Sequence, residues 1–275
     1  MSSIAANLEW LFAEAGETAP DRIRAAAAHG IDAVEIWGWR DKDPVAIQTA
    51  LEDTGVTLLS LVVDPQLQIT DPTTHDEYLS GVRDSLVVAH MLGAPNLVVS
   101  AGNERIGIPR EEQRAAVVAV LRAAARLAAE AGIVLLLEPL NSKVDHVGTF
   151  LSSTREGLDI VKEVGFGNMR LLLDAYHALM MDEDLAEVIG GDVEFVGHVQ
   201  IADAPGRHEP GTGTIDWDMQ LRTLRRLGYT GYWGMEYVPS ADTVASLVAV
   251  EQISKAVEKD MASSRRSGAA LQRGD

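Results

Sequence analysis

The chain has 275 residues, 47% of them hydrophobic, and a formal net charge of −18 at pH 7. This length suits one α/β barrel of roughly 250 residues or two modest domains, and the near-zero mean hydropathy is typical of a globular protein with a full core. The negative field disfavours binding to nucleic-acid phosphates and to acidic membranes, and no apolar run approaches the roughly 20 residues that a membrane span requires.

Short apolar runs alternate with helical segments along the chain. Strands are expected at residues 5–12, 33–37, 56–63, 96–100, 133–138, 169–174, 195–203 and 232–237. The helices between them begin at Pro or a capping residue and end at Gly, as in the segment from Pro20 to Gly30. An open doubly wound sheet would usually carry a glycine-rich turn after its first strand, which residues 7–20 lack. Eight strand–helix units therefore predict one α/β domain, a (β/α)8 TIM barrel over residues 1–260.

The two ends of the chain carry weaker signals. The N-terminus lacks the basic stretch and apolar segment of a signal peptide, and the chain has no cysteine, so we expect a cytoplasmic protein. Residues 261–275 are small and polar, and we expect a disordered tail there. A homo-oligomer is compatible with this composition.

An oxygen-bearing side chain stands at the end of each of the last four predicted strands, namely Glu138, Asp174, Gln200 and Glu236. They are 36, 26 and 36 residues apart, or about one strand–helix unit each. Because the C-terminal ends of barrel strands meet around one mouth, we expect these side chains to converge. Hard oxygen ligands without cysteine favour Mg²⁺ or Mn²⁺ over a structural zinc ion. The alternative for any one of the acids is that it caps the loop or helix that follows it.

Two histidines accompany these residues. His177 is placed in the loop beyond the sixth strand, three residues after Asp174, and is expected to contact the substrate. His198 lies two residues before Gln200 on the same strand face, which favours a role supporting the metal site. The sequence leaves a role as metal ligand open for both histidines.

Arg207 lies in a loop rich in glycine and proline, residues 203–216. A guanidinium above an acidic mouth suits a substrate carboxylate or substrate hydroxyl groups. An ion pair with Glu209 or Asp203 is an equally good interpretation of this loop.

Three tryptophans lie near the ends of the first two predicted strands. Trp10, Trp37 and Trp39 are expected to form an apolar wall beside the substrate, with Trp37 in contact with it. Ordinary packing is the alternative, and it is favoured for Trp10.

Taken together, the strand ends resemble xylose-isomerase-like barrels, and hydroxypyruvate isomerases in particular. The resemblance covers residues 1 to about 258 and rests on these motifs: Glu138-Pro-x-Asn141, Asp174-x-Tyr-His177, His198-Val-Gln200-Ile-Ala-Asp with Pro-Gly-Arg207-x-Glu-Pro-Gly-x-Gly, and Gly234-x-Glu236-Tyr. It implies a divalent metal held by Glu138, Asp174, Gln200 and Glu236, with the two glutamates also transferring protons. Related ketose 3-epimerases have histidine where this chain has Gln200, which favours the hydroxypyruvate isomerase branch. The loop at residues 37–40 is not typical of that branch.

The expected activity is a metal-dependent aldose–ketose isomerisation of hydroxypyruvate, or of a related small hydroxy-keto acid, through a cis-enediolate. If Glu138 and Glu236 faced opposite sides of one carbon, the site would epimerise, so a ketose 3-epimerase or another sugar isomerase is the alternative. A metal-dependent endonuclease would need several histidines on the early strands, and none of the seven histidines ends strands one to four. A barrel that binds a sugar without turning it over would not need two such acids.

Overall fold

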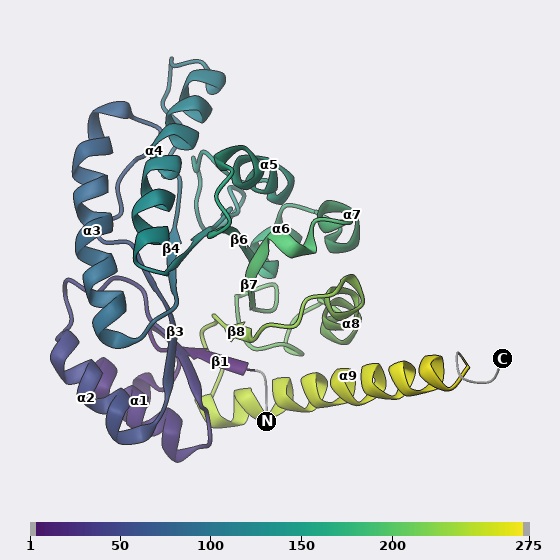
Figure 1. Ribbon diagram of the computed structural model, residues 1–275. Coiled ribbons are helices and arrows are strands. Elements are labelled where there is room, and N and C mark those ends of the chain that lie inside the picture. Colours follow the sequence, from purple (N-terminus) through teal and green to yellow (C-terminus); the bar gives the residue numbers. More distant parts are fainter. Residues whose placement is uncertain (1–3, 272–275) are drawn as a thin grey trace.

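Eight parallel strands close into a barrel in chain order, with β1 paired to β8 (Figure 1). The computed structural model describes the backbone of residues 4–271 and the side chains of residues 4–261. The strands are β1 (Ile4–Asn7), β2 (Ala33–Glu35), β3 (Thr57–Val62), β4 (Asn96–Val99), β5 (Val134–Leu137), β6 (Met169–Asp174), β7 (Val196–Ile201) and β8 (Trp233–Met235). The predicted (β/α)8 fold is confirmed.

Helices connect the strands and surround the barrel (Figure 1). They are α1 (Ala19–Ala28), α2 (Pro44–Thr54), α3 (His75–Leu92), α4 (Arg110–Glu130), α5 (Thr154–Val164), α6 (Ala175–Met180), α7 (Leu185–Ile189), α8 (Trp217–Leu227) and α9 (Thr243–Leu271), with three-residue 3₁₀ turns at Ala13–Ala15, Pro72–Thr74 and Val193–Phe195. The predicted caps account for several boundaries, since Asp43, Ser153 and Asp216 accept backbone N–H bonds at the first turns of α2, α5 and α8. None of the described helices has the length and apolar character needed to cross a membrane.

Two predicted boundaries were wrong for local reasons. The first strand ends at Asn7 instead of residue 12, because the Leu11 N–H bonds back to the Asn7 carbonyl and the chain turns. The loop predicted after the sixth strand is the short helix α6. Asp174 both ends β6 and caps α6, so His177 lies in a helical turn.

The predicted tail falls largely on the end of α9. This helix continues to Leu271 and extends away from the barrel (Figure 1), and residues 272–275 lie outside the described range. The expectation of disorder beyond residue 260 is therefore not tested.

The barrel interior has an apolar floor. Successive strand residues point to opposite faces, so the residue two positions before each strand-end acid points inward as well. Leu136 and Leu172 lie two positions before Glu138 and Asp174, and they pack with Val62 and Val98 in a fully or largely buried cluster. The same alternation that builds this floor aims the strand-end carboxylates into the mouth above it.

Candidate active site

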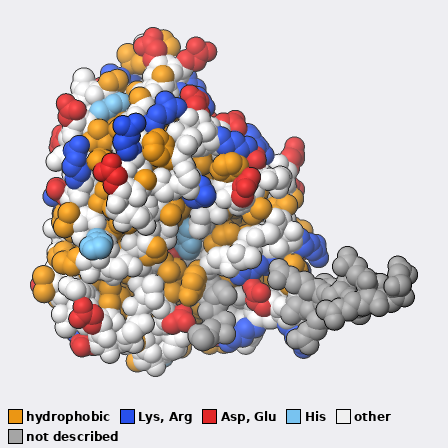
Figure 2. Space-filling model, viewed as in Figure 1, with side chains coloured by type: hydrophobic (Ala, Val, Ile, Leu, Met, Phe, Trp, Pro, Cys, Tyr) orange, Lys and Arg blue, Asp and Glu red, His pale blue; other side chains and the backbone are white. Residues whose placement is uncertain are grey.

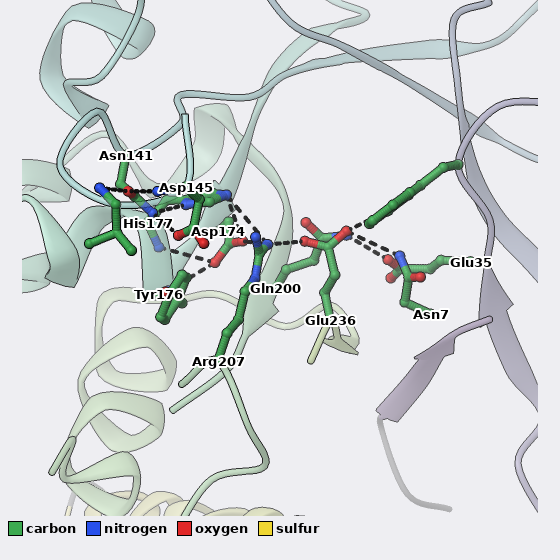
Figure 3. Close-up of polar contacts among 12 residues, drawn as sticks. Asn7, Glu35, Asn141, Asp145, Asp174, Tyr176, His177, Gln200, Arg207 and Glu236 are labelled. Atoms are coloured by element: carbon green, nitrogen blue, oxygen red, sulfur yellow. Dashed lines mark hydrogen bonds and ion pairs between the residues drawn. The ribbon is translucent and has the colours of Figure 1, made fainter. Parts of the chain in front are cut away.

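A cavity of about 300 Å³ opens at the C-terminal ends of the strands. Glu138, Gln200 and Glu236 line it, and so do His177, Arg207 and Trp37. Asp174 is 2% exposed and contacts the guanidinium of Arg207 at the same place. The structure thus brings together all seven residues that the sequence analysis assigned to the site, and Figure 3 shows five of them, Asp174, His177, Gln200, Arg207 and Glu236.

The Asp174 carboxylate has two distinct surroundings. Oδ1 accepts hydrogen bonds from the backbone N–H groups of Tyr176 and His177, at 2.9 and 3.3 Å, and thereby caps α6. Oδ2 is free to face the mouth, where it lies 3.0 Å from Nη2 of Arg207. Asp174 therefore caps α6 through Oδ1, while Oδ2 is the oxygen that a metal ion could bind.

Glu236 is held by donors on both oxygens. Asn7 Nδ2 and Trp37 Nε1 donate to Oε1 at 3.1 and 2.8 Å, and Arg207 Nη2 donates to Oε2 at 2.7 Å. Burial raises the pKa of Glu236 to about 7, against the opposing effect of the Arg207 charge. A carboxyl group with this pKa suits proton transfer near neutral pH.

Glu138 directly follows β5 and lines the same cavity, but the described residues do not give its carboxylate hydrogen bonds like those of Glu236. Burial raises the pKa of its carboxyl well above the usual range, and the negative charges of Glu236 and Asp174 raise it further. One carboxylate oxygen each from Glu138 and Asp174 and one ring nitrogen of His177 lie within 4.8 Å of one another. These three groups are close enough to share a cation.

Arg207 reaches into the mouth from the loop after β7. Its Nη2 lies between Oδ2 of Asp174 and Oε2 of Glu236, at 3.0 and 2.7 Å (Figure 3). The ring centroids of Trp10 and Tyr176 each lie 5.0 Å from the guanidinium carbon, within the range of cation–π contacts. The backbone φ of Arg207 is +53°, a left-handed conformation that is uncommon for a residue other than glycine.

The two acids considered as partners of Arg207 have other roles in the loop. Asp203 is fully buried and accepts backbone N–H bonds from Ala204, Gly211 and Ile215. Glu209 accepts bonds from the backbone and side chain of Ser240. Both acids fix the loop that delivers the arginine.

Glu35 is a residue of the site that the sequence analysis missed. It ends β2, is 1% exposed, and accepts hydrogen bonds from Gln200 Nε2 at 2.7 Å and from His198 Nε2. A carboxylate only accepts, so the amide nitrogen of Gln200 must face Glu35. The amide oxygen of Gln200 is then turned away from it, buried and without a hydrogen-bond partner among the described residues.

Gly234 makes room for this arrangement. It pairs with Gln200 across β7 and β8, and a Cβ at Gly234 would lie 2.7 Å from the Glu35 carboxylate and 2.8 Å from both Gln200 Cγ and His198 Nε2. His198, 5% exposed, is therefore a supporting group bonded to Glu35, as the sequence analysis favoured.

The residues present fit a divalent metal. Carboxylate and amide oxygens are the ligands that Mg²⁺ and Mn²⁺ prefer, and Gln200 Oε1 is a buried acceptor that lacks a donor. The carboxylates of Asp174 and Glu236 already bind one positive charge, because the Arg207 guanidinium contacts both of them. Glu138, Asp174, Gln200 and Glu236 together supply four oxygen-bearing side chains from four consecutive strands.

The tryptophan wall is only partly as expected. Trp37 and Trp10 line the cavity with their rings 5.0 Å apart in an edge-to-face contact. Trp37 has a polar function too, since it donates to Glu236. Trp39 instead packs against the outer core and donates to Ser85, so its predicted place in the wall was wrong.

Fold and site together define a xylose isomerase-like TIM barrel, and the chain belongs to that family, which matches residues 23–259. The resemblance to hydroxypyruvate isomerases is confirmed by relatives that match over most of both chains. A human protein named putative hydroxypyruvate isomerase is 33% identical over 88% of this chain and 91% of its own. The 2-oxo-tetronate isomerase of Cupriavidus necator is 32% identical over 90% of this chain and 96% of its own.

A solved structure shows the same architecture. The structure titled AP endonuclease, family 2, from Brucella melitensis superposes with a TM-score of 0.83 at 30% identity, covering 90% of this chain and 97% of the other. The predicted fold class and family are thus supported by sequence and by structure.

Proposed function

We propose that the protein is a metal-dependent isomerase of small 3-hydroxy-2-oxo acids such as hydroxypyruvate. The observation that carries this proposal is the convergence of Glu138, Asp174, Gln200 and Glu236 on one cavity beneath the Arg207 guanidinium. Relatives named for isomerases of hydroxypyruvate and of 2-oxo-tetronate support it at similar identity. Both compounds are acids with a carbonyl at C2 and a hydroxyl at C3.

The metal would be held by Glu138, Asp174, Gln200 and Glu236, with Mg²⁺ or Mn²⁺ favoured. A divalent ion in this place acts as a Lewis acid that polarises a carbonyl and stabilises negative charge on oxygen. Glu35 accepts a hydrogen bond from the amide nitrogen of Gln200 and so leaves the amide oxygen available to the metal. The cavity volume of about 300 Å³ lies at the lower end of the range for small-molecule sites, which suits a small substrate.

The protein's own acids then move the protons. One of the two glutamates removes the proton from C3, which leaves a cis-enediolate, and returns it to C2. The proton of the C3 hydroxyl moves to the C2 oxygen, so the product is the 2-hydroxy-3-oxo acid and no electron acceptor is needed. The pKa of Glu236, about 7, makes it competent to accept and release a proton near neutral pH.

Arg207 would bind the substrate carboxylate. The chain has 41 acidic residues against 23 basic ones, so an anion needs a fixed cation at the mouth. On the face shown in Figure 2, Lys and Arg side chains are mixed with Asp and Glu side chains. Arg207 is held inside the mouth by Trp10 and Tyr176 and so supplies that charge locally.

The alternative functions differ in what they need. A ketose 3-epimerase or other sugar isomerase would use the same acids on a neutral sugar, for which a cation at Arg207 is of less use. An endonuclease would need histidines on the early strands, whereas the histidines lining the cavity, His146 and His177, come after β5 and β6. A barrel that only binds a sugar would not need acids at both Glu138 and Glu236.

Deuterium exchange would test the reaction. The metal-loaded protein in D₂O, with Mn²⁺, is incubated with hydroxypyruvate, 2-oxo-tetronate and a set of neutral ketoses. We expect the isomerised acid to form with deuterium at C2, because the transferred proton exchanges on the glutamate. The reaction is followed by proton NMR after removal of Mn²⁺.

Chelator-treated protein provides the control for metal dependence. Turnover of ketoses with inversion at C3, and none of the acids, would replace the isomerase by the epimerase. No exchange with any compound would leave a barrel that binds without catalysis.

A further inference from the structure

Asn141, which follows β5, is fully buried, and every hydrogen-bonding position of its side-chain amide is occupied. Its Oδ1 accepts bonds from the backbone N–H groups of Val144 and Asp145, both at 3.0 Å. Its Nδ2 contacts Asp145 Oδ2 at 2.5 Å and His177 Nδ1 at 2.7 Å (Figure 3). An amide has two acceptor positions and two donor hydrogens, and all four are used here.

These contacts fix the orientation of the amide. The exchanged orientation would place the NH₂ group against two backbone N–H donors and the carbonyl oxygen against the Asp145 carboxylate. The contacts with the two backbone N–H groups and with the Asp145 carboxylate would then all become unfavourable. The group that faces His177 Nδ1 is therefore a donor, and Nδ1 must be the acceptor.

The other ring nitrogen then carries the hydrogen. Because Nδ1 accepts a hydrogen bond, it has no hydrogen of its own, so the ring is neutral and its single N–H is at Nε2. Nε2 lies 3.4 Å both from Oδ2 of Asp174, an acceptor, and from Nη2 of Arg207, a donor. These two contacts are long and oppose each other, so the 2.7 Å contact with Asn141 decides the tautomer.

We propose that Asn141 is a positioning residue that holds His177 in the Nε2–H tautomer, so that His177 presents a hydrogen-bond donor to the active site. A metal ligand would need the lone pair of Nε2, which this tautomer does not offer. Of the three groups that cluster within 4.8 Å, Glu138 and Asp174 are then the ligands, and His177 is left to donate to a substrate oxygen. The substrate contact rests on the proposed function; the tautomer does not.

The tautomer can be measured without substrate. In protein labelled with ¹⁵N-histidine, long-range proton–nitrogen NMR distinguishes a protonated from an unprotonated ring nitrogen, and His177→Gln assigns the resonances. We expect Nδ1 of His177 to be unprotonated and Nε2 to be protonated, and this pattern to persist when Mg²⁺ is added. A protonated Nδ1 in the wild-type protein, or loss of the Nε2 hydrogen on adding Mg²⁺, would overturn the inference.

A paired exchange tests whether Asn141 is responsible. The double variant Asn141→Asp with Asp145→Asn keeps the charge of the pair and the acceptors for both backbone N–H groups, but it places a carboxylate against Nδ1. We expect Nδ1 to become protonated there and kcat/KM for hydroxypyruvate to fall by about tenfold, as for loss of one hydrogen bond. The single variant Asp145→Asn is the control, and it should keep the wild-type tautomer because the backbone N–H groups still orient the amide.

The outcomes separate the inference from the proposed function. An unchanged His177 tautomer in the folded double variant would contradict the role of Asn141. The wild-type spectrum remains a test even if that variant does not fold. Inactivity of the wild-type protein toward keto acids, with the expected tautomer, would count against the proposed function alone.

Discussion

Replacing Glu236 by glutamine is expected to lower kcat for hydroxypyruvate by about 10² to 10⁴, the range for loss of a general acid–base group. Glutamine keeps an oxygen that can accept from Asn7 and Trp37, and it gives up only the bond from Arg207, because its NH₂ group cannot accept. It removes the group whose pKa, about 7, suits it to carry the proton. Steady-state kinetics at saturating Mn²⁺ would give kcat, and substrate binding should remain measurable by calorimetry.

Glu183→Gln is the matched control for this change. Glu183 accepts bonds at the first turn of α5, from the backbone of Thr154 and the hydroxyl of Ser153, and does not line the cavity. It should therefore leave kcat unchanged. Near-normal turnover of Glu236→Gln would show that Glu236 is structural or only a ligand.

Replacing Arg207 by methionine is expected to raise KM for hydroxypyruvate by about 10-fold to 100-fold. A charge-assisted hydrogen bond between guanidinium and carboxylate contributes roughly 1.5–3 kcal/mol, and methionine keeps apolar contact with Trp10 and Tyr176. Neutral ketoses should be affected much less, measured as KM or as inhibition constants where they are not turned over. Metal affinity is measured separately, because Nη2 also contacts Asp174 and Glu236.

Arg207→Lys separates charge from geometry. Lysine keeps the positive charge but not the planar pair of donors, so it should recover part of the affinity for the acid. If Arg207→Met impaired acids and ketoses equally, Arg207 would be contacting hydroxyl groups, and a sugar epimerase would become the better proposal.

The sequence predicted those site residues whose position follows from strand direction. Glu138, Asp174, Gln200 and Glu236 each end an apolar run, and parallel strands bring such ends to one mouth. Glu35 was missed because the second strand was predicted to continue to residue 37, which placed this acid inside the strand. The strand instead ends at Glu35.

Side-chain contacts between residues far apart in the chain could not be predicted from the sequence. Glu35 is 165 residues from Gln200, and no local pattern shows that the carboxylate orients that amide. Arg207 was equally compatible with partners in its own loop, whereas the structure places its guanidinium against Asp174 and Glu236, 33 and 29 residues away. The His177 tautomer likewise depends on Asn141, 36 residues away and saturated by backbone groups of its own turn.

The claim on which the proposed function depends is that the oxygens at this mouth hold one divalent ion. Calorimetric titration of chelator-stripped protein with Mn²⁺, with metal analysis of the product, tests it most directly. We expect one ion per chain, and about 10-fold to 100-fold weaker binding in Glu35→Gln, which no longer forces the Gln200 oxygen outward. Absence of binding at micromolar Mn²⁺, or a stoichiometry of three ions per chain, would contradict the account.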